Sequence, residues 1–408
     1  AEAAGNTGTI SLAAIGTDSA AGAASITVGN SRTATLTLGG VEYFSTGAQT
    51  YESDDFNLTG ADITIQTTNN NVTFQDGTTG TAGQIVLSDG ADLTIDTGSG
   101  AGNISINPTI AGTAAGGETT SEDITLDAGT GNIELLNTGA AVIATDIGDV
   151  TLTGTTISVY DNITTTATDS DGNAGVIDIN GAFVLEDSIT IATNNASIDF
   201  DTTIASDSTP RALTIQQGSG TVTVGGDIGG TASNDLGAIT IGATGNNGNI
   251  TLSGSIGTDS IAAATTLAIG NSSTAKITLG GAEYNSSSTQ TWTADEFAVN
   301  GTDATFTTNN ADVDFVDGAS GNFILGNNAD LTITTSGGNI EIASTMQLLG
   351  INGNAAQDVV LNAGTGSVTV GVIGSTTAEI NDITLTGDGG VTLKGNITTR
   401  AHTVDSSE

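Results

Sequence analysis

The sequence predicts an all-β fold, a right-handed parallel β-solenoid (β-helix) of about twenty coils that contains an internal large-scale duplication. Three observations predict this fold. Short segments that alternate apolar and polar residues recur along all 408 residues. Glycine is abundant, at 58 residues, whereas aromatic residues make up only 3% of the chain. One long stretch of sequence also occurs twice.

Each short segment has the apolar-x-apolar pattern of a half-buried strand and is bounded by Gly, Asn or Asp. Ile, Val and Leu lie on one face and Thr on the other, because side chains in a strand alternate with a period of two. Gly, Asn and Asp tolerate the positive φ angles of tight turns. We count roughly thirty such segments, one about every 13 residues. Examples are ADITIQT (61–67), ADLTIDTG (91–98), EDITLDAG (122–129), DVTLTG (149–154), DSITIATN (187–194), GTVTVGG (220–226), GNITLSG (248–254), ADLTITT (329–335) and GSVTVG (366–371).

The duplication aligns residues 8–60 with residues 249–301 without a gap, so that Tyr51 matches Trp292 and Phe56 matches Phe297. Shorter matches follow, with small insertions and deletions. We therefore expect three parts. They are repeat copy one (1–170), unique intervening coils (171–248) and repeat copy two (249–408).

A solenoid accommodates such a repeat better than a propeller or a sandwich does. A propeller needs equal blades of about 40–45 residues, and no such period is present. In a solenoid each coil contacts only its neighbours, so loops can lengthen without disturbing the stack. Coils of roughly 20 residues, with two or three strands each, give the predicted twenty.

Several short segments share one style of repeat, namely GNITL, GAQTY, DAGTGNIEL and DVTLTG. These segments resemble the repeats of filamentous-haemagglutinin-like β-solenoid proteins, which are large bacterial surface or secreted adhesins. The resemblance covers nearly the whole chain at the level of single coils. It implies the shaft of such a protein, and it brings no catalytic residues with it.

The charge of the chain excludes several classes of function. There are 45 acidic and 5 basic residues, which give a formal net charge of −40. Such a chain repels nucleic acids and anionic membranes, and no apolar run is long enough for a membrane span. The absence of cysteine excludes disulfides and thiolate metal sites. We therefore expect neither nucleic-acid binding nor membrane insertion.

An enzyme is the less favoured alternative. Parallel β-helices include polysaccharide-active enzymes, and their lyases use clustered Arg or Lys side chains. The five basic residues here are scattered, and the single histidine, His402, leaves no catalytic triad. We expect no catalytic residues.

Two segments contain candidate ligands for Ca²⁺. YESDDF (51–56) and its duplicate WTADEF (292–297) place Asp54 and Asp55, or Asp295 and Glu296, between aromatic residues. Carboxylates bind Ca²⁺ and aromatic faces stack on sugars. In the alternative interpretation, which we favour, the aromatic side chains fill the core and the acids face water.

A third candidate is ATDSDGNAG (167–175), where Asp169, Asp171 and Asn173 alternate as they would in a calcium loop. An EF-hand loop requires Gly and Glu at positions that hold Ala174 and Asn180 here. Aspartates also precede many strands, and in stacked coils they either share cations or accept hydrogen bonds from turn amides. These residues are Asp62, Asp92, Asp123, Asp149, Asp330, Asp358 and Asp382. Calcium is thus the one cofactor that the sequence suggests, and no cofactor is required.

The sequence as a whole predicts a non-enzymatic extracellular structural protein. The chain opens AEAAGNTG without a methionine, which favours a processed, exported polypeptide. We expect a subunit or shaft of a surface fibre whose partner is a second copy of the chain, stacked head to tail through its strands. Cell-surface glycans are a second expected partner. The alternative is a monomeric stalk in a giant adhesin.

Overall fold

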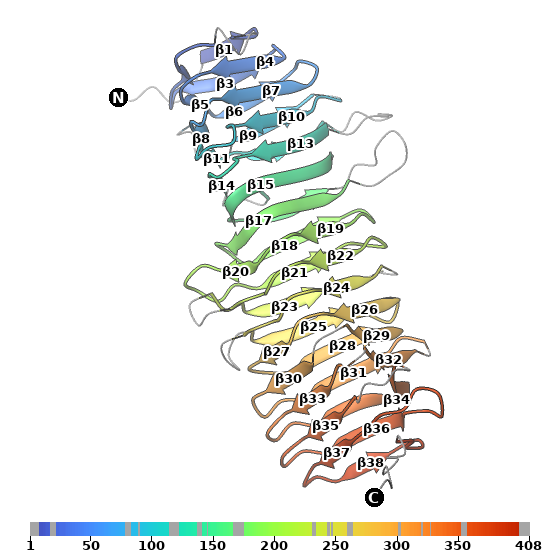
Figure 1. Cartoon of the computed structure of the whole chain (residues 1–408). Helices are drawn as coiled ribbons and strands as arrows, with labels where there is room; N and C mark the ends of the chain where they lie inside the picture. The colour runs from blue at the N-terminus through green and yellow to red at the C-terminus, as the bar shows by residue number, and fades with distance from the viewer. Residues whose placement is uncertain are drawn as a thin grey trace, which may run out of the picture. The chain divides into compact units, whose positions relative to one another are not determined.

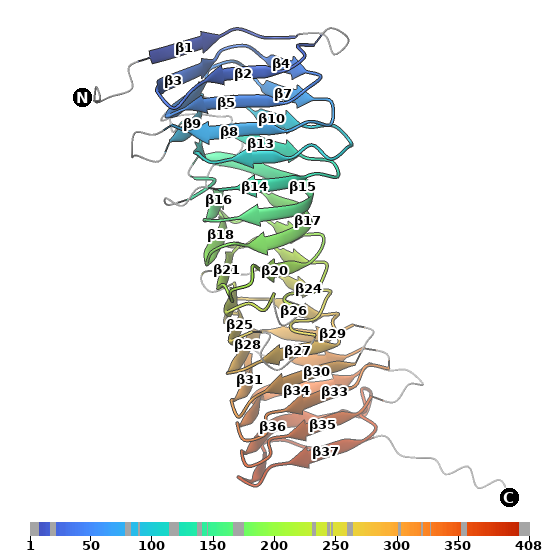
Figure 2. The same cartoon turned by 90° about the vertical axis from the view of Figure 1, so that its left-hand side faces the viewer.

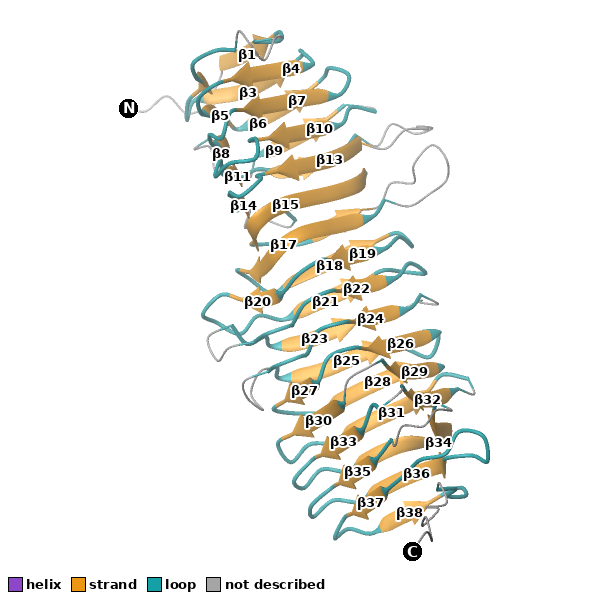
Figure 3. Ribbon diagram, viewed as in Figure 1, coloured by secondary structure: helices purple, strands orange, loops and turns teal. Residues whose placement is uncertain are grey.

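The computed structural model describes residues 8–16, 22–77, 83–88, 90–113, 122–136, 141–144, 146–165, 175–230, 234–242, 245, 248–258, 264–300, 303–319, 321–326, 328–351 and 357–399. The described residues contain 38 β-strands and no helix (Figure 3). Neighbouring strands pair in parallel throughout the ladders described below. The predicted all-β parallel β-solenoid is therefore confirmed.

The chain forms two compact units, one of residues 1–207 with 211–220 and the other of residues 208–210 with 221–408. Within each unit successive coils lie one on the next (Figure 1). Three ladders of parallel strands, here named faces A, B and C, follow one another around each coil.

In the first unit, face A begins with a five-stranded ladder and continues through isolated bridges at Ile143. It consists of β1 (Gly8–Leu12), β3 (Thr33–Leu38), β6 (Asp55–Leu58), β9 (Gln84–Leu87), β12 (Thr109–Ala111), β16 (Ile163–Thr165), β18 (Ile189–Thr193) and β21 (Leu213–Gln216). Face B consists of β4 (Glu42–Ser45), β7 (Ile63–Thr67), β10 (Leu93–Asp96), β13 (Glu122–Asp127), the first halves of β15 (Ile147–Val159) and β17 (Ile177–Leu185), and β19 (Ile198–Phe200). Face C consists of β2 (Ile26–Gly29), β5 (Gln49–Ser53), β8 (Val72–Asp76), β11 (Ile104–Ile106), β14 (Asn132–Leu135), the second halves of β15 and β17, and β20 (Ile204–Ser206).

The second unit repeats this order. Its face A consists of β22 (Val222–Val224), β24 (Ile250–Leu252), β26 (Lys276–Leu279), β29 (Glu296–Val299), β32 (Asn322–Leu325) and the second parts of β34 (Ile340–Gly350) and β36 (Val368–Ile373). Face B consists of β27 (Glu283–Ser286), β30 (Ala304–Thr308), β33 (Leu331–Thr334), β35 (Val359–Asn362) and β37 (Ile383–Thr386), which lie in that order in Figure 2. Face C consists of β23 (Ala238–Ile241), β25 (Thr266–Gly270), β28 (Gln290–Ala294), β31 (Val313–Asp317), the first parts of β34 and β36, and β38 (Val391–Leu393).

The number of coils differs from the prediction. The structure has about 13 turns, because most coils are longer than the expected 20 residues. Leu36 pairs with Phe56, 20 residues further on, whereas Val72 pairs with Ile104, 32 residues further on. The estimate of about twenty coils was therefore wrong. Variable loops lengthen the coils without changing the pairing of the strands.

The core of each unit is a column of inward-facing side chains. Along β17, for example, the burial pattern alternates strictly, and Ile177, Ile179, Phe183 and Leu185 are fully buried. Side chains between them point outward and remain partly exposed. This is the burial that the period-two alternation predicts, and removal of a large apolar side chain from such a ladder costs about 2–5 kcal/mol.

Tight corners join the faces, and three of them share a Thr-Asn-Asn turn or its close relative. The hydroxyl of Thr193 donates to the carbonyl of Ala196 at 2.8 Å, and the Thr67 and Thr308 hydroxyls bond the carbonyls of Asn70 and Ala311. Asn69, Asn195 and Asn310 lie inside these turns with φ angles of 58°, 70° and 58°. Asparagine is one of the few residues other than glycine that adopts this left-handed conformation readily.

Candidate functional site

The aspartates that precede strands form hydrogen-bonded ladders between coils. In the first unit, Asp92 Oδ1 accepts the main-chain N–H of Asp123 at 2.9 Å, and Asp123 Oδ1 accepts that of Asp149 at 2.8 Å. Asp149 Oδ1 in turn accepts the N–H of Val176 at 2.8 Å. Each carboxylate therefore satisfies a corner amide of the following coil, always in the same direction along the chain.

The second unit contains the same ladder. Asp303, Asp330 and Asp358 accept the N–H groups of Asp330, Asp358 and Asp382 at 3.0, 2.7 and 3.1 Å. These bonds show that the turn-amide role, rather than cation sharing alone, accounts for the position of the aspartates. The amide belongs to the next coil, which the sequence did not predict.

Asparagine performs the same task at another corner. Asn71 Oδ1 accepts the N–H of Asn103 at 2.9 Å, and Asn103 Oδ1 accepts that of Asn132 at 2.9 Å. In the second unit the corresponding bonds run from Asn339 N–H to Asp312 and from Ser367 N–H to Asn339, at 2.6 and 3.0 Å. Because a neutral amide replaces the carboxylate, the ladder requires an acceptor oxygen and not a negative charge.

The negative charges of the aspartate ladder oppose its stability. Burial raises the pKa of Asp330, and the hydrogen bond from the Asp358 N–H opposes this rise. The neighbouring charges of Asp303 and Asp358 raise the pKa of Asp330 further. Carboxylates stacked at the strand spacing of about 4.8 Å repel one another.

The first acidic corner lies between β5 and β6. Tyr51 and Phe56 on either side of it are fully buried, whereas Asp55 is exposed and Asp54 is partly buried. The aromatic rings therefore fill the core, as the favoured interpretation predicted, and their faces are covered. Tyr51 stacks on Phe74 of the next coil with a centroid separation of 4.9 Å.

A third carboxylate approaches this corner from the next coil. Asp76 pairs in register with Ser53, next to Asp54. Burial raises the pKa of Asp76, the Gly83 N–H opposes the rise, and the charges of Asp54 and Asp55 add to it. Gly77 lies against Asp54, since a Cβ at position 77 would be 2.0 Å from Asp54 Oδ1.

The duplicate corner, between β28 and β29, is partly neutralised. Lys276 Nζ lies 2.8 Å from Glu296 Oε1, and the two residues pair in register on β26 and β29. Asp317 Oδ1 accepts the N–H of Gly321 at 3.1 Å. Asp295 Oδ1 is buried, and no hydrogen bond reaches it from the part of the chain that the structure describes.

The structure describes the calcium candidates at the two acidic corners but not those at 169–173. No group of three or more His, Cys, Asp or Glu side chains within the described ranges is arranged to hold a metal ion. Asp54 and Asp76 meet at one corner and Asp295 lies at the other, but Asp55 is exposed and Glu296 is paired with Lys276. Asp169, Asp171 and Asn173 lie outside the described residues. Calcium binding stays a prediction.

A buried glutamine in each unit was missed by the sequence analysis. Gln290 is fully buried, and its Nε2 donates to the carbonyls of Tyr284 and Thr307 at 2.8 and 3.0 Å. Its Oε1 accepts the indole N–H of Trp292 at 3.3 Å. One side chain thus joins three strands, β27, β28 and β30, in two coils.

The same arrangement in the first unit explains one substitution in the duplication. Gln49 Nε2 donates to the carbonyls of Tyr43 and Gln66 at 2.9 and 2.7 Å, and its Oε1 accepts the Tyr51 hydroxyl at 2.5 Å. Tyr51 and Trp292 occupy equivalent positions because each provides an apolar ring and one hydrogen-bond donor. The duplicated Gln-Thr-aromatic sequence was the available signal.

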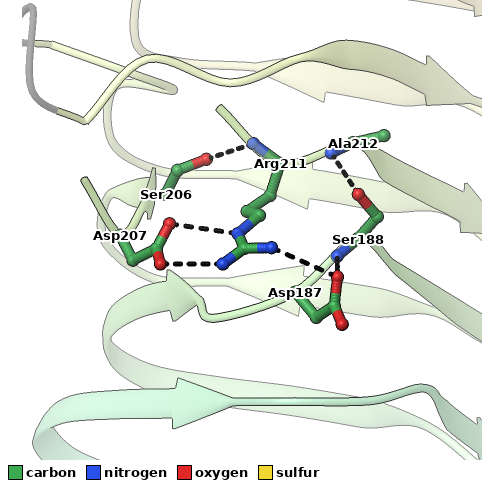
Figure 4. A network of polar contacts seen from close by, with 6 residues as sticks. All are labelled: Asp187, Ser188, Ser206, Asp207, Arg211 and Ala212. Carbon is green, nitrogen blue, oxygen red and sulfur yellow. Dashed lines mark hydrogen bonds and ion pairs between the residues drawn. The ribbon is translucent and has the colours of Figure 1, made fainter. Parts of the chain in front are cut away.

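Arg211 forms the largest ion-pair cluster in the described residues (Figure 4). Its Nε and Nη2 donate to the two carboxylate oxygens of Asp207 at 3.1 and 2.9 Å, and Nη1 lies 3.4 Å from Asp187 of the preceding coil. The Arg211 main-chain N–H donates to the Ser206 hydroxyl at 3.0 Å. The bidentate pair closes the loop between β20 and β21 on the outside of the coil.

The last described coil exposes its inward-facing residues. Val391, Leu393 and Ile397, here named the C-terminal end face, are 42%, 46% and 41% exposed. Their partners one coil deeper are Val368, Val370 and Ile373, all of which are fully buried. Ile10, Leu12 and Ile15 at the other end of the described chain are partly exposed in the same way and are named the N-terminal end face.

Comparisons of the chain with protein-family models, curated proteins and solved structures find no match. The parallel β-solenoid implied by the resemblance is present, and the resemblance to one particular family has no further support. Among the described residues, no helix is long and apolar enough to cross a lipid bilayer.

Proposed function

We propose that the chain is a non-enzymatic structural protein, a subunit or shaft of an extracellular fibre that extends by stacking coils end to end. The C-terminal end face carries this proposal. Its side chains are about half exposed, whereas the residues in register with them one coil deeper are fully buried.

An added coil would remove this apolar surface from water. Burial of a Val, Leu or Ile side chain is worth about 1.5–3 kcal/mol for full transfer, so three half-exposed side chains provide a real driving force. The added coil would also satisfy the main-chain N–H and C=O groups along the free edge of β38. Repulsion between the acidic sides of two solenoids would leave the ends as the favoured places for association.

The proposal includes the finer expectations from the sequence. They are right-handed coiling, which the strand–crossover–strand rule favours, export to the cell surface, and kinship with filamentous-haemagglutinin-like shafts. A single copy in a longer covalent shaft would use the same end face within one chain.

Concentration-dependent light scattering and negative-stain electron microscopy of the purified chain test the proposal. We expect fibres whose length grows with concentration, and we expect Leu393→Asp to abolish them while leaving the far-UV circular dichroism and melting temperature unchanged. Thr392→Asp, which places the same charge on the outward side of β38, is the matched control. A wild-type chain that remains monomeric at every concentration would refute the proposal.

Calcium binding at the acidic corners is a separate part of the proposal. The buried Asp295 Oδ1 is an oxygen that could coordinate a cation. Asp54 and Asp76 make the electrostatic potential at the other corner more negative. A melting temperature that falls when EGTA is added, and recovers with excess Ca²⁺ but not with Na⁺, is the expected result. A melting temperature that EGTA does not change would refute calcium binding at these corners.

A further inference from the structure

The second unit contains a pair of stacked strands that provides a template for contact between two copies of the chain. β24 lies on β22 with Val222 opposite Ile250, Thr223 opposite Thr251 and Val224 opposite Leu252. A bridge between Ile228 and Ile256 continues this contact around the corner. Once covered in this way, Val222, Val224 and Ile228 are at most 1% exposed.

The C-terminal end face has nearly the same sequence as the covered surface. Residues 391–397 read VTLKGNI and residues 222–228 read VTVGGDI, with four of seven positions identical and the spacing from strand to isoleucine unchanged. The copy-one counterpart of the end face is residues 157–163, ISVYDNI, which share only two positions with it. The end face therefore resembles the surface that receives β24 more than the surface that is covered by β17.

The N-terminal end face in turn resembles β24. Ile10 and Leu12 pair with Leu36 and Leu38 of β3, as Ile250 and Leu252 pair with Ile277 and Leu279 of β26. The bridge from Ile15 to Tyr43 likewise corresponds to the bridge from Ile256 to Tyr284. In the covered position Ile250, Leu252 and Ile256 are at most 1% exposed, whereas Ile10, Leu12 and Ile15 are partly exposed.

We propose that a second copy of the chain seats its β1 on β38 in the register of the β22–β24 stack. In this junction Val391 faces Ile10 of the second copy, Thr392 faces Ser11, and Leu393 faces Leu12. Ile397 meets Ile15, as Ile228 meets Ile256. This register deepens the proposed function and rests on it.

The continuity of the ladders at the C-terminal end face favours a second copy of the chain as the partner that covers it. Two ladders of the second unit, those of faces C and A, reach β38 and Ile397 with their pattern uninterrupted. The junction adds a further parallel strand to them, with β1 of face A seated on β38 of face C. The segment between Leu12 and Ile15 is one residue shorter than that between Leu252 and Ile256, so the gap-free alignment of 8–60 with 249–301 is wrong by one residue over Gly8–Leu12. The comparison with the β22–β24 stack therefore applies only to the strand residues and to the contact between Ile397 and Ile15.

Engineered cysteines test the register, because the natural chain has no cysteine. Ser11 and Thr392 are outward-facing and exposed, and in the proposed register their Cα atoms are about 4.8 Å apart, within disulfide range. Ser11→Cys and Thr392→Cys are made as separate variants, mixed under assembly conditions and oxidised. We expect a covalent dimer of one chain of each variant, identified by non-reducing electrophoresis and peptide mass spectrometry.

Thr37→Cys is the matched control for Ser11→Cys. Thr37 lies in register with Ser11 one coil further in, so that its Cα would be about 9.6 Å from that of Thr392, beyond disulfide range. We expect the yield of dimer with Thr392→Cys to be at least tenfold lower for Thr37→Cys than for Ser11→Cys.

The outcomes separate the register from the proposed function. Fibres without the Ser11–Thr392 disulfide, or with equal cross-linking of Thr37→Cys, would overturn the register and leave end-to-end assembly standing. A disulfide that forms only between two Thr392→Cys chains would replace the head-to-tail junction with a two-fold one. Absence of any assembly would remove both proposals.

Discussion

Replacement of Gln290 by methionine tests whether the buried amide holds neighbouring coils together. Methionine keeps the length and approximate volume of the side chain, so the change removes hydrogen bonds without leaving a large cavity. The variant loses the bonds from Nε2 to Tyr284 and Thr307 and the bond from Trp292 to Oε1. It also leaves the indole N–H buried without an acceptor.

Each lost bond is worth about 0.5–1.5 kcal/mol net, and an orphaned buried donor costs about 1–3 kcal/mol. The apolar methionine offsets part of this loss, because the cost of desolvating the amide disappears. We therefore expect the free energy of unfolding of the surrounding coils to fall by about 2–4 kcal/mol.

Urea unfolding followed by tryptophan fluorescence measures this change where it occurs. Trp292 is the only tryptophan in the chain, is fully buried and touches Gln290, so its emission reports on these coils. Thr291→Val, an outward-facing change on the same strand, is the control and should alter the free energy of unfolding by less than about 0.5 kcal/mol. A Gln290→Met variant as stable as this control would refute the role of the amide.

Substitutions at three further residues test the electrostatics of the coils. Burial, Asp312 and Glu341 raise the pKa of Asp314 to about 6, so the folded state binds more protons than the unfolded state between about pH 4 and 6 and stability falls as pH rises through this window. Asp314→Asn should raise the melting temperature at pH 7 and flatten its dependence on pH between about 4 and 6; an unchanged slope would contradict this. Asp330→Asn keeps the acceptor for the next coil and should change the free energy of unfolding by less than about 0.5 kcal/mol, whereas Asp330→Ala should lower it by about 1–2 kcal/mol; equal losses in the two variants would show that the charge matters. Arg211→Lys loses the bidentate bond and should lower the free energy of unfolding by about 0.5–1 kcal/mol at low salt and by less in 1 M NaCl; a loss that does not depend on salt would indicate a packing role instead.

The sequence predicted the parts of the structure that depend on local pattern. The alternation in segments such as ADLTIDTG predicted that Leu93 and Ile95 would be buried and Thr94 would face outward, because a strand has a period of two. The duplication predicted equivalent corners at YESDDF and WTADEF. It also identified the aromatic residues there as core, because rings that flank acids at a corner must point inward to avoid water.

The sequence did not predict contacts between coils. Asp92 and Asp123 are 31 residues apart, yet the carboxylate of one accepts the N–H of the other. The interval between stacked residues ranges from 19 to 33, so no fixed period connects them. The same uncertainty produced the overestimate of the coil number.

Composition and alternation by themselves determined that this chain is an all-β stack with an apolar core and an acidic surface. Only the tertiary structure decided which acids bond the next coil, which glutamines join three strands, and which apolar residues lie uncovered at the end. The physical reason is that a strand's two faces are set by neighbours in sequence, whereas stacking depends on loop lengths that vary from coil to coil. Those loops leave the strand register unchanged while moving its partner along the chain.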